Sequence, residues 1–368
     1  MACSDLSEAH TLLESGLKEE MAGRRDEARK HYTKAMQILI ILSDRENGKG
    51  KTRRLQQADA IQKAIDRLNG LTTEYSGDPT KMEGKNILKK LGLDSYTVEE
   101  VSMKDVVGLE EVKKEIMLRI VYPFRFKELS EEYNISPGGG ILLYGPPGNG
   151  KTFIVKAIAN EIEANFIYVN PASLYSQWFG NFEKNISDLF KAARMLSPTI
   201  LFFDEIDALA SSRSLTDSDV VRRGVSQFLN ELGGFSTSSS EVVFVIGATN
   251  DPWHIDQAIT RPGRLDRLLY VPPPDQQARK IMFANRLSKV KNIGKLDYDA
   301  MSKLTSGYSA ADIDYVCTKA SQNVFLDAVK HGSSRPVGQK DVELAISEVK
   351  SSVDRTILDR YRDFSLAR

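Results

Sequence analysis

Apolar positions in residues 6–71 recur every three or four residues, which is the spacing of one helix face. Three such stripes comprise Leu6, Ala9, Leu13 and Leu17; Ala28, Tyr32, Ala35, Leu39 and Leu42; and Leu55, Ala58, Ile61, Ile65 and Leu68. Gly23 and a turn at residues 47–50 separate the stripes, and Gly70 ends the last one. Because short connections join antiparallel helices, we predict a three-helix bundle over residues 1–71.

The pattern weakens over residues 72–100. Residues 75–79 carry the turn chemistry Tyr-Ser-Gly-Asp-Pro, and only residues 87–93 are weakly apolar. We therefore predict a linker over 72–100, with room for one short helix.

From Asp105 onward, short apolar runs alternate with helical stretches. The runs are Gly140–Tyr144, Phe166–Val169, Ile200–Phe203, Val242–Ile246 and Leu268–Val271. This alternation predicts an α/β domain with a mainly parallel sheet over residues 101–274. No strand-like run follows Pro274, so residues 275–368 are predicted to form a helical lid that includes a C-terminal helix.

Composition narrows the possible partners. Lys plus Arg and Asp plus Glu number 50 each, which favours neither nucleic acid nor direct membrane binding. The two cysteines, Cys3 and Cys317, support neither a disulfide framework nor a zinc cluster. The start of the chain lacks signal-peptide features, and no apolar run is long enough to span a bilayer. We expect a cytoplasmic protein that meets membranes only indirectly.

A phosphate-binding loop follows the first strand-like run. Its residues are Gly145, Pro146, Pro147, Gly148, Asn149, Gly150, Lys151 and Thr152, and a helix is predicted from Phe153. Glycines let backbone N–H groups surround a phosphate, and the helix N-terminus adds positive charge. We expect Lys151 to reach the β- and γ-phosphates of ATP and Thr152 to ligate Mg²⁺. A simple Gly/Pro-rich turn is the alternative, and the strand before and helix after favour nucleotide.

A second run ends in two carboxylates. Asp204 follows Ile200–Phe203, where a strand end would present it to the magnesium, and Glu205 is placed to deprotonate the attacking water. The alternative is a solvated acidic turn. At the tip of the next strand, Asn250 can bond the γ-phosphate or that water, although Asn-Asp-Pro is also an ordinary turn.

Three arginines, Arg261, Arg264 and Arg267, lie close together in residues 260–267, and a single nucleotide site does not need so many. Arginines that project toward a neighbouring subunit's γ-phosphate would make hydrolysis depend on assembly. Surface salt bridging is the alternative, which the arginines alone would favour.

Together these segments resemble the AAA ATPases, in particular the group of ESCRT-III-disassembling ATPases, katanin, spastin and fidgetin. The matching pieces are residues 105–109, 145–152, 204–207, 248–250 and 307–312. The resemblance implies an ATP-dependent homohexamer that threads polypeptide through a pore. It also implies that Asp105, Val107, Phe153, Ala310 and Ala311 belong to the nucleotide pocket.

Residues 176–180 fall where the family has its first pore loop. Gln177, Trp178 and Phe179 are the expected substrate contacts, because an aromatic face packs against almost any side chain. A buried Trp-Phe pair is the alternative. Arg222 and Arg223 are candidates for a second pore loop.

Residues 6–71 resemble an MIT domain, a three-helix module that docks tails of ESCRT-III proteins in a groove between helices. A bundle that only mediates self-assembly is the alternative. Three features depart from the ATPase group named above: the predicted lid has no strand insertion, and no histidine follows Pro274 near the expected adenine position. The third is the Arg-Pro-Gly-Arg segment, which suggests Arg261 and Arg264 as the arginine fingers. The architecture is most similar to that of the archaeal Cdv cell-division ATPases.

The resemblance favours remodelling of ESCRT-III-like filaments. Microtubule severing is an alternative, but the predicted linker is not basic, as a grip on acidic tubulin tails would require. A general unfoldase is a third hypothesis, which leaves the N-terminal bundle unexplained.

Overall fold

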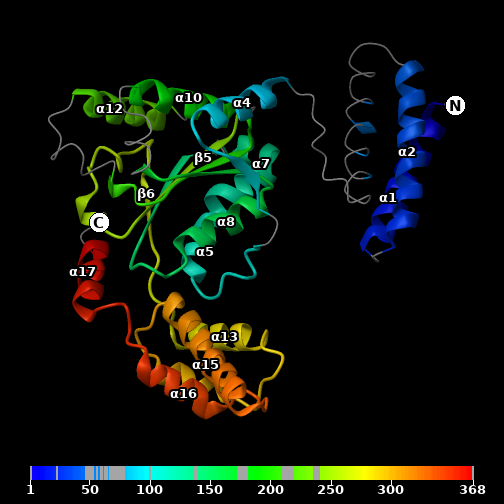
Figure 1. Cartoon of the computed structure of the whole chain (residues 1–368). Helices are drawn as coiled ribbons and strands as arrows, with labels where there is room; N and C mark the ends of the chain where they lie inside the picture. Colours follow the sequence, from blue (N-terminus) through cyan, green and yellow to red (C-terminus); the bar gives the residue numbers. More distant parts are fainter. Residues whose placement is uncertain are drawn as a thin grey trace. The chain divides into compact units, whose positions relative to one another are not determined.

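The structure is a computed structural model that describes residues 2–21, 24–45, 54, 57, 58, 61, 65, 79–98, 101–133, 135, 139–171, 181–208, 219–234 and 241–366. The chain divides into two compact units, Met1–Asp78 and Pro79–Arg368 (Figure 1). None of the helices within these described ranges is long and apolar enough to cross a membrane.

Two helices, α1 (Ala2–Met21) and α2 (Arg25–Arg45), pack together in the first unit. The predicted stripe of α2 is buried at every position, which confirms the helix. A Cβ atom at Gly16 would lie 2.6 Å from the ring of Tyr32, so this glycine lets the two helices approach closely. The predicted third helix lies largely outside the described residues, but Ala58, Ile61 and Ile65 are helical and buried in the same core.

The second unit contains a six-stranded sheet in the order β1-β3-β4-β5-β2-β6. The strands are β1 (Ser95–Thr97), β2 (Gly139–Tyr144), β3 (Asn165–Val169), β4 (Thr199–Phe203), β5 (Val243–Thr249) and β6 (Arg267–Tyr270). All neighbours are parallel except β1, which pairs antiparallel with β3. The mainly parallel sheet predicted from the five apolar runs is therefore confirmed.

Helices cover both faces of the sheet (Figure 1). One face packs against α4 (Pro79–Lys90), α10 (Phe182–Met195) and α12 (Asp219–Gly233), the other against α5 (Glu110–Ile116) and α8 (Lys151–Glu161). Between α5 and β2 the chain forms the π-helical turn η1 (Met117–Val121), α6 (Tyr122–Arg125) and α7 (Lys127–Glu132). Burial on both faces explains why the inner strands are continuous apolar runs.

Strand β5 extends three residues beyond its predicted end. Gly247 and Ala248 have the composition of a turn, but both are buried and β5 continues to Thr249. A Cβ atom at Gly247 would lie 3.0–3.1 Å from the side chains of Leu265, Ile206 and Leu142. The small residue therefore serves close packing in the sheet core, so the predicted end of the strand was wrong.

Residues 79–98 belong to the second unit, whereas the sequence predicted a linker as far as residue 100. In this segment α4 packs against α10, and Leu88 and Leu91 are buried in the core of the sheet domain. The following strand, β1, forms the edge of the sheet. The packing partners lie about a hundred residues later in the chain, so the local pattern gave no sign of them.

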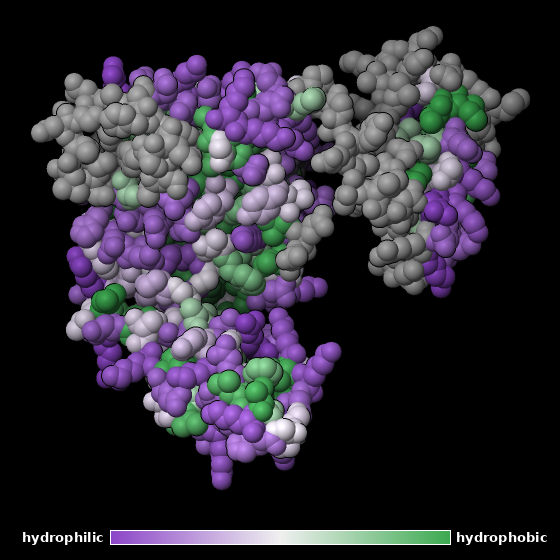
Figure 2. Space-filling model, in the orientation of Figure 1, coloured by the Kyte–Doolittle hydropathy of each residue, from purple (hydrophilic) through white to green (hydrophobic). Residues whose placement is uncertain are grey.

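The helices after the sheet form a lid with its own core. They are α13 (Gln276–Leu287), α14 (Tyr298–Leu304), α15 (Ala310–His331) and α16 (Gln339–Glu348). Figure 2 shows a largely polar surface over the upper helices of the sheet domain and an apolar patch over the lid. Phe325, Leu326 and Val329 of α15 are among the exposed apolar side chains of the lid.

The last helix, α17 (Arg355–Leu366), leaves the lid and packs against the sheet domain. The buried ring of Tyr361 lies against Tyr270 and Trp253, with centroids 5.7 and 5.1 Å away. Phe364 meets Tyr144 edge-to-face at 5.3 Å. The short helix η2 (Pro252–His254), which carries Trp253, completes this aromatic cluster.

Candidate nucleotide site

The loop between β2 and α8 has a backbone that depends on glycine. Gly145, Gly148 and Gly150 have φ angles of +150°, +75° and +83°. A Cβ atom at Gly145 would lie 2.3 Å from the carbonyl oxygen of Val271, and one at Gly148 would lie 2.9 Å from the Ala311 Cβ. Both the positive φ angles and these close approaches therefore exclude side chains at Gly145 and Gly148. Helix α8 begins directly after this loop, and no side chain caps its first N–H groups. This loop can accept a phosphate at the helix N-terminus.

Lys151 is buried, and its ammonium faces neutral acceptors. Nζ donates to the carbonyl oxygens of Gly145 and Pro146 at 2.8 and 2.9 Å and to Asn250 Oδ1 at 2.7 Å. Burial lowers the pKa of Lys151 to about 8. A cation held this way gains strongly from an anionic partner, since its present ligands carry no full charge.

Two oxygen-bearing side chains meet at the carboxyl end of β4. Thr152 Oγ1 donates to Asp204 Oδ2 at 3.3 Å, while Asp204 Oδ1 accepts from the Glu205 N–H at 3.1 Å. Glu205 is exposed and has a left-handed φ of +52°, which is unusual outside glycine. Hydroxyl and carboxylate oxygens are the ligands that Mg²⁺ prefers, so this pair fits that cation.

A tyrosine hydroxyl also reaches this carboxylate. The Tyr168 hydroxyl donates to Asp204 Oδ2 at 3.3 Å. Burial raises the pKa of Tyr168 above its ordinary value, and the neighbouring Asp204 carboxylate raises it further. Tyr168 was not among the predicted site residues, because a tyrosine in a predicted strand has no distinguishing pattern.

Asn250 links the loop to α17. Its side chain accepts from Lys151, and its backbone carbonyl accepts a short hydrogen bond from the Tyr361 hydroxyl. Burial raises the pKa of Tyr361. Tyr361 was also absent from the predicted site, since more than a hundred residues separate it from Asn250.

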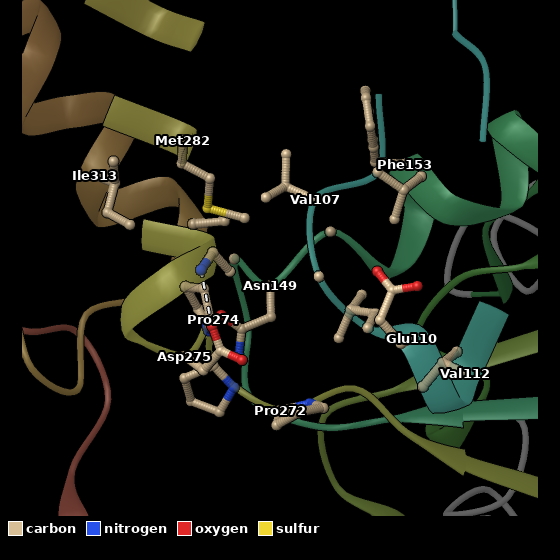
Figure 3. A pocket seen from close by; sticks show the side chains of 18 of the residues that line it. Val107, Glu110, Val112, Asn149, Phe153, Pro272, Pro274, Asp275, Met282 and Ile313 are labelled. Carbon is tan, nitrogen blue, oxygen red and sulfur yellow. Dashed lines mark hydrogen bonds between the residues drawn. The ribbon is translucent and has the colours of Figure 1, made fainter. Parts of the chain in front are cut away.

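A cavity of about 1020 Å³ opens beside the glycine loop. Its walls include the predicted residues Asp105, Val107, Gly148, Asn149, Gly150, Phe153, Ala310 and Ala311. Figure 3 shows Val107 and Met282 pointing into the cavity from opposite walls. The Ala311 N–H donates to the Gly148 carbonyl at 3.0 Å and joins the lid to the loop.

Polar groups in the cavity fit a bound nucleotide. Both side-chain polar atoms of the buried Asn149 lack a partner within the described part of the chain. Such buried atoms cost free energy until a ligand or water satisfies them. Asp105 accepts from the N–H and hydroxyl of Ser102 at 2.8 and 2.7 Å, and these bonds hold the pKa of Asp105 below its ordinary value.

The remaining predicted residues lie elsewhere. Arg261 is exposed, and Arg264 donates to the Ala258 carbonyl at 2.7 Å. Neither arginine is among the described residues that line the cavity. Gln177, Trp178 and Phe179, the predicted pore loop, fall outside the described residues, as does the side chain of Arg222. Both arginines considered for a second loop lie in α12, and the Arg223 side chain is exposed.

A glycine loop between strand and helix, acidic and amide groups at the ends of the next strands, and a helical lid define a P-loop nucleotide-binding protein. Residues 141–273 match the sequence model of the ATPase family associated with various cellular activities (AAA). The chain is 40% identical over 275 residues to a cell division cycle protein 48 homolog from Archaeoglobus fulgidus, covering 72% of this chain and 37% of that protein. It is 43% identical over 230 residues to a putative cell division cycle ATPase from Plasmodium falciparum, covering 62% and 19%.

Two solved structures match nearly over their whole length. The FIGL-1 AAA domain has a TM-score of 0.66 and 32% identity, with 77% of this chain and 95% of that one covered. The same domain in complex with ADP has a TM-score of 0.65 and 30% identity, covering 80% and 98%. This chain belongs to the AAA family of ATPases. It spans 37% and 19% of the two relatives above, which are longer proteins.

Proposed function

We propose that this protein is a magnesium-dependent ATPase that uses ATP hydrolysis to remodel other proteins. One observation carries the proposal: Lys151, Thr152, Asp204 and Asn250 converge at the ends of β2, β4 and β5, beside a cavity that ends at the glycine loop. The ADP complex of the similar FIGL-1 domain supports a nucleotide as the occupant.

Each group has a distinct task in this proposal. The N–H groups of residues 148–150 and the Lys151 ammonium would bind the β- and γ-phosphates. Thr152 and Asp204 would hold Mg²⁺, which would supply charge neutralisation for the phosphate oxygens. Glu205 takes the proton of the attacking water, and Asn250 orients that water or the γ-phosphate.

The adenine occupies the cavity between the sheet domain and the lid. Asp105 and Val107 border it on one side, with Ala310 and Ala311 on the lid side. Phe153 contributes an apolar wall from the first turn of α8. A nucleotide bound there would contact both parts, because the sheet domain and the lid both contribute walls.

A neighbouring subunit would supply further positive charge for the γ-phosphate. Arg261 and Arg264 lie outside the chain's own cavity, so we propose that they act on the nucleotide of the next subunit in a homohexamer. Hydrolysis would then require the ring, and monomers would bind nucleotide with little turnover.

For the substrate, we propose an ESCRT-III-like filament protein. The N-terminal unit, a separate helical body in its described residues, would dock the filament tail as an MIT-like module. Gln177, Trp178 and Phe179 would then draw the subunit through the pore. We further propose that the protein acts in cell division as the Cdv ATPases do, because it combines an N-terminal helical unit with a single AAA domain.

Two substitutions separate binding from turnover. Lys151→Ala should abolish binding of a fluorescent ATP analogue, because no other cation lies within the loop. Glu205→Gln should bind ATP with wild-type affinity and hydrolyse it about 10²–10⁴-fold more slowly, since only the base is lost. Wild-type affinity in the first variant, or wild-type turnover in the second, would overturn the assigned roles.

The substrate is tested with Glu205→Gln as a trap. This variant, with and without residues 1–78, is incubated with ATP in extract of its own cells and recovered with its bound proteins. Small charged filament proteins that require residues 1–78 support the proposal. Recovery of tubulin would instead indicate severing, and a broad mixture of unfolded proteins regardless of residues 1–78 would indicate a general unfoldase.

A further inference from the structure

Tyr168 is an exposed residue of the otherwise largely buried strand β3. The neighbouring β3 residues Phe166, Ile167 and Val169 are fully buried, whereas Tyr168 is 38% exposed. Side chains alternate along a strand, so Tyr168 shares the face of Phe166, which packs in the same core as α8. Tyr168 thus lies on the face of the sheet from which Thr152 approaches.

The ring of Tyr168 has a fixed support. It pairs in register with Phe202 on β4, and the two ring centroids lie 5.9 Å apart. Phe202 is fully buried and precedes Asp204 by two residues. The backbone next to the ring is also tied to the acidic residue, because the Asp204 N–H donates to the Val169 carbonyl at 3.1 Å.

The Tyr168 hydroxyl donates to the same Asp204 oxygen as the Thr152 hydroxyl. Asp204 Oδ2 accepts from Tyr168 and from Thr152, each at 3.3 Å, while Oδ1 accepts from the Glu205 N–H. Both carboxylate oxygens are therefore engaged, by donors from β3, from α8 and from the turn after β4. Tyr168 is the contributor from outside the predicted site.

We propose that Tyr168 is a positioning residue for the magnesium site: its hydroxyl holds the Asp204 carboxylate beside the Thr152 hydroxyl. The inference rests on the proposed function, since it requires that these two residues bind Mg²⁺. Mg²⁺ tolerates little deviation from octahedral geometry, so the orientation of each oxygen ligand matters. Loss of a hydrogen bond that orients a ligand costs about 10–100-fold in metal affinity or activity in other metal sites.

A competing role for Tyr168 is to cover the end of the sheet with its ring. Tyr168→Phe separates the two roles, because it keeps the ring and its contact with Phe202 and removes the hydroxyl alone. Tyr96→Phe is the matched control. Tyr96 lies on the adjacent strand β1, is 43% exposed and rests its ring on Phe166 with centroids 5.4 Å apart.

The first measurement is metal affinity without turnover. Full-length wild type and both variants are loaded with one equivalent of ADP and titrated with Mn²⁺, an oxygen-binding stand-in for Mg²⁺ whose free ion gives a paramagnetic resonance signal. ADP affinity is measured separately in EDTA. We expect Tyr168→Phe to weaken Mn²⁺ binding about tenfold and to leave metal-free ADP affinity unchanged. Tyr96→Phe should match wild type in both.

The second measurement is the Mg²⁺ dependence of hydrolysis. In Tyr168→Phe, the Mg²⁺ concentration for half-maximal rate should rise about tenfold, with most of the maximal rate recovered at saturation. A covering role would instead leave both the Mg²⁺ dependence and the maximal rate of Tyr168→Phe at their wild-type values, because the ring is kept.

The outcomes separate the two proposals. If wild type binds neither ADP nor Mn²⁺, the proposed function itself fails. If wild type binds both and Tyr168→Phe shows the same Mn²⁺ affinity and Mg²⁺ dependence, only the positioning role of Tyr168 is refuted. Equal weakening in Tyr96→Phe would also refute it, by showing that the effect does not depend on the Asp204 contact.

Discussion

At the scale of single residues, Lys151 shows how the fold prepares a charge for a ligand. The residue is 8% exposed, and its ammonium donates to two carbonyl oxygens and one amide oxygen. Desolvation disfavours the charged form, and neutral acceptors compensate only in part. The result is a cation whose stability depends on the arrival of an anion.

This arrangement predicts that ADP affinity depends on pH. The pKa of Lys151 is lowered from 10.5 to about 8 without nucleotide, and bound phosphate should raise it again. Above about pH 8 the lysine must therefore take up a proton when ADP binds, and affinity should fall by up to about tenfold per pH unit. Fluorescence titrations between pH 7 and 10 measure this decline, and Lys156→Ala, a second lysine of α8, should show the same profile. A flat profile would contradict the protonation of Lys151 on binding.

The nucleotide-free protein should show the opposite trend in stability. Since the folded pKa of Lys151 lies below the unfolded value of 10.5, the unfolded chain binds more protons between about pH 8 and 10.5. The contribution of Lys151 to the free energy of unfolding therefore rises with pH in that window.

Residues that act through neighbours in sequence could be predicted, and residues that act across the fold could not. Asp204 follows β4 directly, and Lys151 and Thr152 follow the glycine loop after β2, so strand ends and motif spacing sufficed to select them. Tyr168 and Tyr361 reach their partners over 36 and 111 residues of chain. Their roles depend on strand register and on the docking of α17, which short-range patterns do not encode.

At the scale of elements, α17 fastens the end of the second unit to the sheet domain. The Tyr361 hydroxyl bonds the Asn250 carbonyl, and Arg360 lies 3.7 Å above the Trp253 ring. Ser365 adds a hydrogen bond of 2.7 Å to the Tyr144 hydroxyl. The absence of strand-like runs after Pro274 predicted a C-terminal helix, but nothing local indicated which surface this helix would meet.

Tyr361→Phe should lower the free energy of unfolding of the second unit by about 1 kcal/mol, because one hydrogen bond is lost and the ring packing is kept. Tyr361→Ala should cost about 3–5 kcal/mol, since the buried ring leaves a cavity. Denaturant unfolding followed by tryptophan fluorescence measures both. Tyr315→Phe, on an α15 side chain that is 56% exposed, should change nothing. Equal effects of Tyr361→Phe and Tyr315→Phe would argue against the Asn250 contact.

The segment 79–98 provides the second test at this scale. Leu88 is 1% exposed in the sheet-domain core, whereas Met82 on the same helix is 65% exposed. Leu88→Ala should destabilise the second unit by about 2–5 kcal/mol, and Met82→Ala should have little effect. A loss below about 0.5 kcal/mol for Leu88→Ala would show that α4 behaves as the tether that the sequence suggested.

At the scale of the whole second unit, the cavity joins parts of the chain that fold as separate cores. The sheet domain and the lid have their own apolar clusters, and both line the cavity. A nucleotide between them should stabilise the unit as a whole. At an ADP concentration about 100 times its dissociation constant, the gain should be about 2.7 kcal/mol.

Thermal unfolding with increasing ADP tests this coupling. A rising midpoint is expected in wild type, whereas Lys151→Ala should show none because it lacks the phosphate contact. An unchanged midpoint in wild type at saturating ADP would show that the nucleotide does not bind the folded unit selectively.

The residues that line this cavity are synthesised at different times. Its residues extend from Asp105 to Ser365, so the glycine loop leaves the ribosome about two hundred residues before α17 is made. At the usual pace of translation this interval is roughly 10–40 s. During that time the chain adds first Asn250, then the lid helices and last α17 with Tyr361 and Phe364 of the aromatic cluster. Until these later parts are made, a growing chain can offer ATP only part of a site, and the newly made protein becomes competent for nucleotide late, when its last helix has docked.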